Sequence, residues 1–319
     1  MKKLFSLFFA LAFVLMLPAG CLAEENRVQI GALQGPTAMG MVEMMRDRAD
    51  TYEFTIAGSA DVLTPSLIQG ELDIAAVPAN LAAVLYNNTS GQVKVLAINT
   101  LGVLYIVERG DTVQSVEDLR GKTLYTAGKG STPEYALNYI LRGNGLDPQT
   151  DLTIEFMSEH SECLAALMND PTAVAMLPQP FATVAQSQAE DMRIALDLTA
   201  EWDALQADSE TPSAMLTGVV VARTAFIEEN PDAVAAFLSD YEQSIQFTLE
   251  NTADAAALIG EYDIFEAAVA EKALPYCNIT FVAGEEMQGL LSGYLEVLYE
   301  QDPASVGGTL PDEAFYYLG

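Results

Sequence analysis

An internal repeat constrains the fold of this chain more than any other feature. Residues 74–84 read IAAVPANLAAV and residues 174–184 read VAMLPQPFATV, so an apolar strand, a proline turn and a helix recur in the same order. Each copy follows a strand–loop–helix pattern, over residues 28–45 and 122–141. The repeat therefore predicts two similar α/β lobes. Ligand sites favour domain boundaries, so we expect the turns of both lobes to face a shared cleft.

The rest of the chain alternates apolar strands with helices, and two polar segments interrupt this alternation. Residues 108–118 and 201–213 are the polar segments, and we expect the chain to cross between the lobes there. Two crossings make one lobe discontinuous. The expected division is a first lobe of residues 24–108 and 214–319, and a second lobe of residues 109–213.

Composition limits the class of protein. The chain has 319 residues, which is long enough for two folded domains. Its residues are 50% hydrophobic and 18% charged, as in a globular protein. Its formal charge of −31 argues against a nucleic-acid partner.

The first 23 residues have the pattern of a secretory signal. Two lysines, Lys2 and Lys3, precede an apolar run that ends at Pro18. Two processing routes remain open: acylation at Cys21, which follows Ala19 and Gly20 as in a lipobox, or cleavage after Ala23. Either route predicts an exported protein, which the first route would anchor to the membrane by a lipid on Cys21.

The cysteine and histidine content favours binding over catalysis. Cys163 and Cys277 fall in different expected lobes, so we predict two buried free thiols. The single histidine, His160, lies in a polar stretch and is expected on the surface. No spacing of metal ligands appears, and we expect no cofactor.

The stretch GKGSTPEY, residues 128–135, predicts a tight turn that opens a helix. Gly128 and Gly130 flank Lys129, and Glu134 follows Ser131 at the spacing of a capping box. Free backbone N–H groups and the helix dipole at such a start favour an anionic group. The stretch lacks the first glycine of a Walker A loop, so it is not a nucleotide loop of that type.

Five stretches carry a resemblance to a known family. They are GPTAMGMVEMM (35–45), GELDIAAVPANLA (70–82), GKGSTPEYALNYILRGNGLDP (128–148), LPQPFATVA (177–185) and SVGGTLPDEAFYY (305–317). The mature chain resembles the solute-binding proteins of bacterial ABC importers, in the branch that binds nitrate, sulfonates, taurine and thiamine precursors. The resemblance implies a two-lobed fold of the periplasmic-binding-protein type II kind, a hinge that closes on one small solute, and delivery to a membrane permease. We expect a monomer.

The resemblance also implies the ligand contacts, which would come from the turns that follow strands. The residues at these positions are Gln34, Thr37, Ser59, Asn80, Lys129, Gly130, Ser131, Thr132, Gln179 and Phe181. The family often has an acidic residue where this chain has Gln179, which argues against a ligand amine at that turn. The lipobox also departs from the usual form, because Pro18 stands where leucine is common.

The sequence leaves alternatives open for both the function and the ligand. An enzyme on the same fold, with Lys129 as its reactive group, and an extracytoplasmic sensor are the alternatives to a transport protein. Lys129 and the helix start favour an anion such as a sulfonate or nitrate, whereas Asp61 and Glu134 could hold an amine. Aromatic side chains could instead stack a pyrimidine-like heterocycle; they are Phe181, Tyr135 and Trp202.

Overall fold

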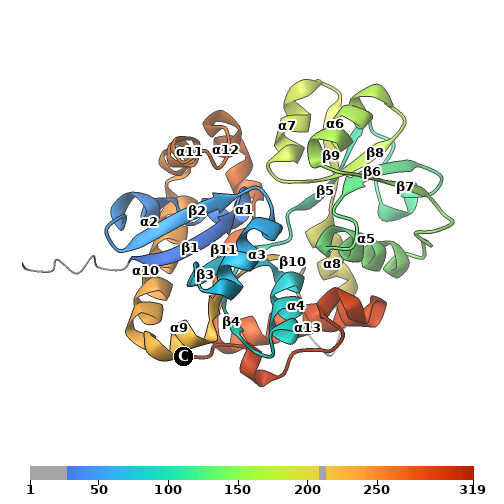
Figure 1. Cartoon of the computed structure of the whole chain (residues 1–319). Helices are drawn as coiled ribbons and strands as arrows, with labels where there is room; N and C mark the ends of the chain where they lie inside the picture. Colours follow the sequence, from blue (N-terminus) through green and yellow to red (C-terminus); the bar gives the residue numbers. More distant parts are fainter. Residues whose placement is uncertain (1–26, 208–212) are drawn as a thin grey trace, which may run out of the picture.

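The computed structural model describes residues 27–207 and 213–319, and it confirms the expected two α/β lobes (Figure 1). Each lobe has its own mixed sheet, of six strands in the first lobe and five in the second. The expected signal segment and Cys21 lie outside the described residues. None of the helices in the described part is long and apolar enough to cross a membrane.

The first sheet combines parallel and antiparallel strands in the order β11–β4–β10–β3–β1–β2. Strand β1 runs parallel to β2 and β3, whereas β10 runs antiparallel to β3 and β4. The bounds are β1 (Val28–Leu33), β2 (Tyr52–Ala57), β3 (Ile74–Pro78), β4 (Val93–Leu101), β10 (Leu216–Arg223) and β11 (Ile279–Ala283).

The second sheet has the order β7–β6–β8–β5–β9. Its strand β6 runs parallel to β7 and β8, and β5 runs antiparallel to β8 and β9. The bounds are β5 (Leu104–Arg109), β6 (Thr123–Ala127), β7 (Thr153–Met157), β8 (Val174–Pro178) and β9 (Met192–Asp197).

Helices cover both sheets. The two copies of the sequence repeat form β3 with α4 (Ala79–Asn88) and β8 with α7 (Phe181–Gln188). Both strands are central in their sheets and almost fully buried, which explains their continuous apolar sequences. The first lobe also carries α1 (Pro36–Met39), α2 (Val42–Asp47), α3 (Ala60–Gln69), α9 (Thr224–Glu229), α10 (Pro231–Glu250), α11 (Thr252–Glu261), α12 (Ala267–Ala273) and α13 (Gly284–Gln301). The second carries α5 (Thr132–Gly143), α6 (His160–Asn169) and α8 (Leu198–Gln206).

The first crossing lies earlier than expected. Strand β4 belongs to the first sheet and β5 to the second, so the chain changes lobes at Gly102 and Val103. The expected boundary after Glu108 is therefore displaced, and the whole of β5 belongs to the second lobe.

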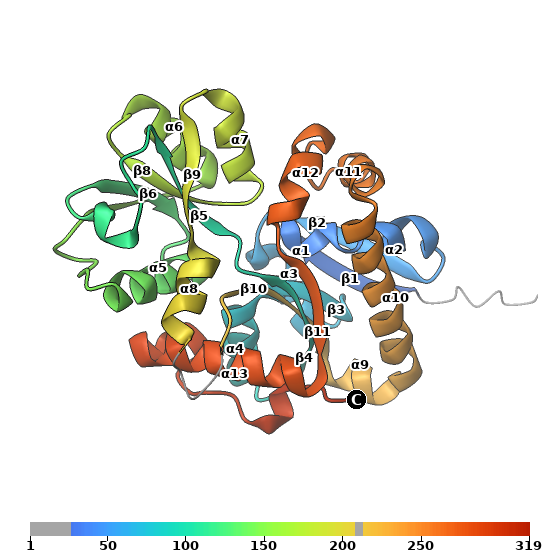
Figure 2. The same ribbon diagram turned by 180° about the vertical axis from the view of Figure 1, so that it is seen from behind.

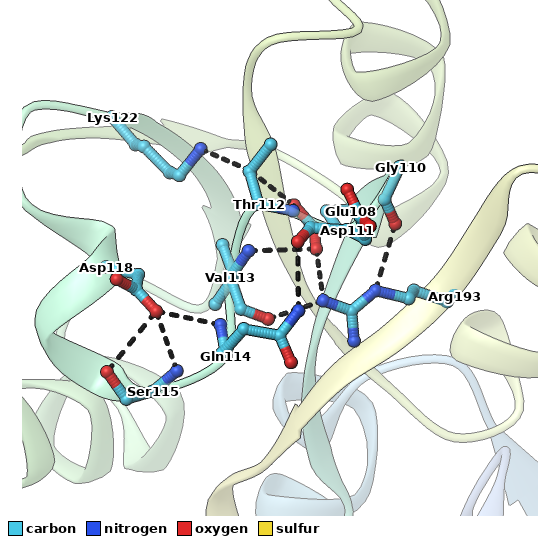
Figure 3. Close-up of polar contacts among 10 residues, drawn as sticks. All are labelled: Glu108, Gly110, Asp111, Thr112, Val113, Gln114, Ser115, Asp118, Lys122 and Arg193. Carbon is cyan, nitrogen blue, oxygen red and sulfur yellow. Dashed lines mark hydrogen bonds and ion pairs between the residues drawn. The ribbon is translucent and has the colours of Figure 1, made fainter.

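A buried carboxylate explains why residues 108–118 are not a crossing (Figure 3). The Glu108 side chain is 1% exposed and accepts hydrogen bonds from the Thr112 hydroxyl at 2.7 Å and the Val113 amide at 3.0 Å. It also pairs with Arg193 on β9 at 2.5 Å. Burial alone would raise the pKa of Glu108, but these hydrogen bonds and the Arg193 charge together lower it. The polar run is thus a loop fastened to its own lobe.

The crossing itself is closely packed. A Cβ atom added to Gly102 would lie 2.2 Å from Thr199 Oγ1, so no larger residue fits without movement. The Asn278 amide donates to the Gly102 carbonyl at 2.5 Å, and the Leu101 amide donates to the Asn278 carbonyl at 3.0 Å. Asn278, which precedes β11, therefore fixes the point at which the chain leaves the first sheet.

Trp202 on α8 lies where the second lobe meets the first. It is fully buried, and its indole N–H donates to Ser213 Oγ at 3.1 Å. Its ring packs 4.4 Å from Tyr139 on α5 and 5.6 Å from Tyr294 on α13, measured between centroids. The only tryptophan of the chain thus touches both lobes.

Candidate functional site

Several turns at the carboxyl ends of strands meet between the lobes, as expected for ligand sites in open α/β sheets. In both ribbon views α7 of the second lobe lies beside α12 of the first, with the crossing strands beneath them (Figures 1 and 2). Two contacts join turns from opposite lobes: a hydrogen bond between Asn80 and Thr132, and an aromatic contact between Phe181 and Phe265.

The Asn80–Thr132 contact joins two predicted site residues. Thr132 Oγ1 donates to Asn80 Oδ1 at 3.0 Å, and the Asn80 amide donates to the Ser305 carbonyl at 3.2 Å. Both side chains are buried, at 6% and 7% exposure. Because buried polar groups require partners, this bond couples the start of α5 to the first lobe.

Two donors of the loop 128–132 are paired within the second lobe. The Gly130 amide donates to Glu134 Oε2 at 2.6 Å, and Ser131 Oγ donates to the Gly128 carbonyl at 2.6 Å. The expected capping box is therefore wrong: its glutamate would accept from the backbone amide of Ser131, whereas Glu134 accepts from that of Gly130. The exposed Lys129 places its ammonium 5.5 Å from the centroid of the Phe156 ring, on β7.

The turn after β8 holds an unpaired amide. Gln179 is 1% exposed, and its Oε1 accepts from the Thr183 amide at 3.2 Å and the Thr183 hydroxyl at 2.8 Å. Its Nε2 has no partner in the described part of the chain. An unpaired buried donor costs free energy, so this group is suited to a ligand acceptor.

His160 is half-buried, so its expected place on the surface is wrong. Its ring lies 5.5 Å from that of Phe181, centroid to centroid, and this packing removes it from water. Burial lowers the pKa of His160 to about 4, so the imidazole is neutral at pH 7. Its buried Nδ1 also lacks a partner within residues 27–207 and 213–319.

An open hollow of about 830 Å³ lies between α7 and the segment that joins α11 to α12. Phe265 lines it and packs edge-on against Phe181, with centroids 5.9 Å apart. Gln34 also lines it and donates to the Asp263 carbonyl at 3.1 Å. The volume suits a small ligand. Its lining residues include Asp263 and Glu266, and no lysine or arginine.

Thr37 and Ser59, two further predicted residues, follow β1 and β2. Thr37 is buried and donates to the Leu33 carbonyl at 3.0 Å, while Ser59 is exposed and makes no capping bond. Phe265 was not predicted, and no motif marks it, because it lies in an irregular segment that only the fold brings to Phe181.

The arrangement offers hydrogen-bonding groups and aromatic surfaces. Cys163 and Cys277 are buried free thiols, as predicted. Burial raises their pKa values to about 11 and about 12, so both are protonated at neutral pH. No three His, Cys, Asp or Glu side chains in the described ranges gather as a metal site would require.

Comparisons with known proteins agree with the fold. The family model described as the phosphonate ABC transporter periplasmic substrate-binding protein matches residues 41–272. A search of curated proteins finds no match.

Solved structures of similar architecture include three relatives. An ABC transporter protein from Parabacteroides distasonis has a TM-score of 0.77 at 23% identity, over 91% of this chain and 98% of that one. The aliphatic sulphonate binding protein SsuA from Escherichia coli has a TM-score of 0.71 at 16% identity, over 91% and 92%. The alkanesulfonate-binding protein SsuA from Xanthomonas axonopodis pv. citri, bound to MOPS, has a TM-score of 0.63 at 14% identity, over 90% and 94%.

Proposed function

Because this chain belongs to the family of periplasmic substrate-binding proteins of phosphonate ABC transporters, we propose that it captures one small solute between its lobes for delivery to a membrane permease. The observation that best supports a site between the lobes is the buried Asn80–Thr132 hydrogen bond. It couples two strand-end turns, one from each lobe, at positions where the sequence predicts ligand contacts.

The proposed site consists of the predicted turn residues and two additions. The predicted residues are Gln34, Thr37, Ser59, Asn80, Lys129, Gly130, Ser131, Thr132, Gln179 and Phe181. His160 and Phe265 are added because they pack against Phe181. Solute binding would favour the closed arrangement of the lobes, with bending at Gly102 and at α8.

The proposed role is binding without chemistry. The two thiols are protonated, and Lys129 is exposed and lies over an aromatic ring. The similar structures include proteins that bind sulfonates, so a sulfonate or phosphonate is one candidate solute. A pyrimidine-like heterocycle is the other, since Phe265 lines the hollow and packs against Phe181.

A thermal-shift screen tests this function. The panel holds methylphosphonate, alkylsulfonates, taurine, nitrate and pyrimidines, and a ligand at a hundredfold excess over its dissociation constant stabilises the native state by about 2.7 kcal/mol. We expect one class to raise the melting temperature and to change Trp202 emission, because that ring contacts both lobes.

The matched variants are Thr132→Val, which removes the hydroxyl at the lobe contact, and Thr150→Val, which removes an exposed hydroxyl elsewhere in the second lobe. Only the first should weaken the ligand response. Absence of a response to every compound would count against solute capture by this site.

A further inference from the structure

We propose that the contact between Phe181 and Phe265 is a latch between the lobes. It holds them together on one side of their interface, and the lobes open there by turning about the opposite side, where they share one hydrophobic core. The role of this latch rests on the proposed function, because opening would admit and release the solute.

The shared core lies on the side of α5 and α8. In both ribbon views these helices of the second lobe lie beside α4 and α13 of the first (Figures 1 and 2). One continuous cluster of buried side chains runs through all four helices, and it includes Ala82, Leu137, Trp202, Leu291 and Leu295. Separating the lobes here would expose this core to water, and a large aromatic ring such as Trp202 alone buries about 150–250 Å².

Hydrogen bonds join the lobes on the same side. Gln301 Nε2 on α13 donates to the Tyr135 carbonyl on α5 at 3.1 Å, and the Thr132 hydroxyl donates to Asn80 Oδ1 at 3.0 Å. Thr132 and Asn80 are buried, so breaking their bond would leave polar groups without partners. The side of the shared core therefore acts as the pivot.

On the side of the latch the two lobes keep separate cores. Phe181 packs on a cluster of the second lobe that contains Cys163 and Leu177, whereas Phe265 packs on a cluster of the first lobe that contains Ile259. Both rings are partly exposed and meet edge-on, with centroids 5.9 Å apart. The open hollow of about 830 Å³ lies beside them, so little buried surface is lost when the two rings part.

A further hydrogen bond on the side of the latch lies next to the crossing. The Tyr105 hydroxyl donates to the Tyr276 carbonyl at 2.9 Å, and Tyr105 is two residues after Val103, where the chain changes lobes. Displacement in a rotation is smallest near the hinge, so this bond moves less than the two phenylalanine rings. The Phe181–Phe265 contact is therefore the one that opening has to break.

Double electron–electron resonance on the protein from residue 24 onward, without added solute, tests the latch. It measures the distribution of distances between spin labels on two introduced cysteines. The native Cys163 and Cys277 are buried, so they should not take up label. One label pair crosses the latch and the other crosses the shared core, all at exposed positions; they are Gln186→Cys on α7 with Glu271→Cys on α12, and Ala204→Cys on α8 with Glu296→Cys on α13.

Phe265→Ala removes one ring of the latch, and its matched control is Phe54→Ala, at a partly exposed phenylalanine on β2 of the same lobe. In Phe265→Ala we expect the longer distances of the latch pair to gain at least fivefold in population over the shorter ones. The control should leave that distribution unchanged, and the distance across the shared core should stay the same in both variants. If Phe265→Ala does not fold, Phe181→Leu should give the same result from the second lobe.

The outcomes separate this inference from the function on which its role rests. Lengthening of both distances together in Phe265→Ala would overturn the pivot. An unchanged distribution across the latch, or an equal change in Phe54→Ala, would overturn the latch. Because no solute is present in this experiment, failure of the thermal-shift screen would count against the proposed function alone.

Discussion

The buried carboxylate of Glu108 should be one of the strongest polar supports of the second lobe. Replacing it in Glu108→Gln keeps the side-chain volume but removes the charge that faces Arg193 at 2.5 Å. The variant should unfold more easily, because the charge that faces Arg193 is lost and a donor replaces the oxygen that accepts from the Thr112 amide and hydroxyl.

The burial of the two side chains determines how much stability Glu108→Gln should lose. Breaking a fully buried ion pair costs about 3–5 kcal/mol, but the Arg193 side chain is 32% exposed and can regain water. The Val113 amide is buried and can still bond to the remaining carbonyl oxygen of the glutamine. We therefore expect a decrease of about 2 kcal/mol in the free energy of unfolding at pH 7.

Urea unfolding followed by circular dichroism measures this decrease. With a slope of roughly 1–3 kcal/mol per molar urea, the midpoint should fall by about 1 M. The matched control is Asp191→Asn, which breaks the exposed pair with Arg109 and should change the midpoint little. Equal effects of the two variants would refute the argument from burial.

The pH dependence of stability gives a second check, because the direction of the pKa shift of Glu108 determines the sign of the change. The pKa of Glu108 is lower in the folded state than its ordinary value of 4.5. Its contribution is therefore complete above about pH 4.5 and is lost as the pH falls through the lower folded-state pKa. The difference in stability between the protein and Glu108→Gln should shrink on acidification, and a difference that grows would contradict the assignment.

Three further predictions concern the contacts between the lobes and the thiols. Gly102→Ala should destabilise the protein by about 1–3 kcal/mol in urea unfolding, because the added methyl group meets a side chain at the crossing; unchanged stability would show that the crossing relaxes freely. Thr132→Val should cost about 1 kcal/mol through loss of the bond to Asn80, and the double variant with Asn80→Ala should be non-additive; strict additivity would mean that the two side chains do not interact. Cys163 and Cys277 should resist a thiol reagent at pH 8 in the folded protein and react together on unfolding, because burial raises both pKa values; rapid labelling of the folded state would contradict their burial.

The two-lobed fold could be predicted because the repeat around Pro78 and Pro178 records a strand and a helix in each lobe. The lobe boundary at Gly102 and Val103 could not be predicted. Strands β4 and β5 are both mostly buried, and no local sequence feature determines which sheet a buried strand joins. In sequence, Glu108 resembles the start of a polar linker, because its partner Arg193 is 85 residues away.

The candidate site shows the same limit. The spacing of Ser131 and Glu134 predicted a carboxylate at the helix start, but the bond reaches Gly130, one residue earlier. His160 was assigned to the surface because its neighbours are acidic, whereas packing against Phe181 removes it from water. Local patterns thus predicted which turns matter, and long-range packing decided which of their atoms are free.

The position of β10 has a consequence for the order in which the chain can fold during synthesis. This strand lies between β3 and β4 in the first sheet, yet it follows the whole of the second lobe in sequence. When a ribosome has released residues up to 207, the five strands of the second sheet are present, while β3 and β4 still lack the strand that joins them. The first lobe therefore begins to form first but is completed last. A nascent chain stalled before β10 would contain all strands of the second sheet, but the first sheet would be split between β3 and β4.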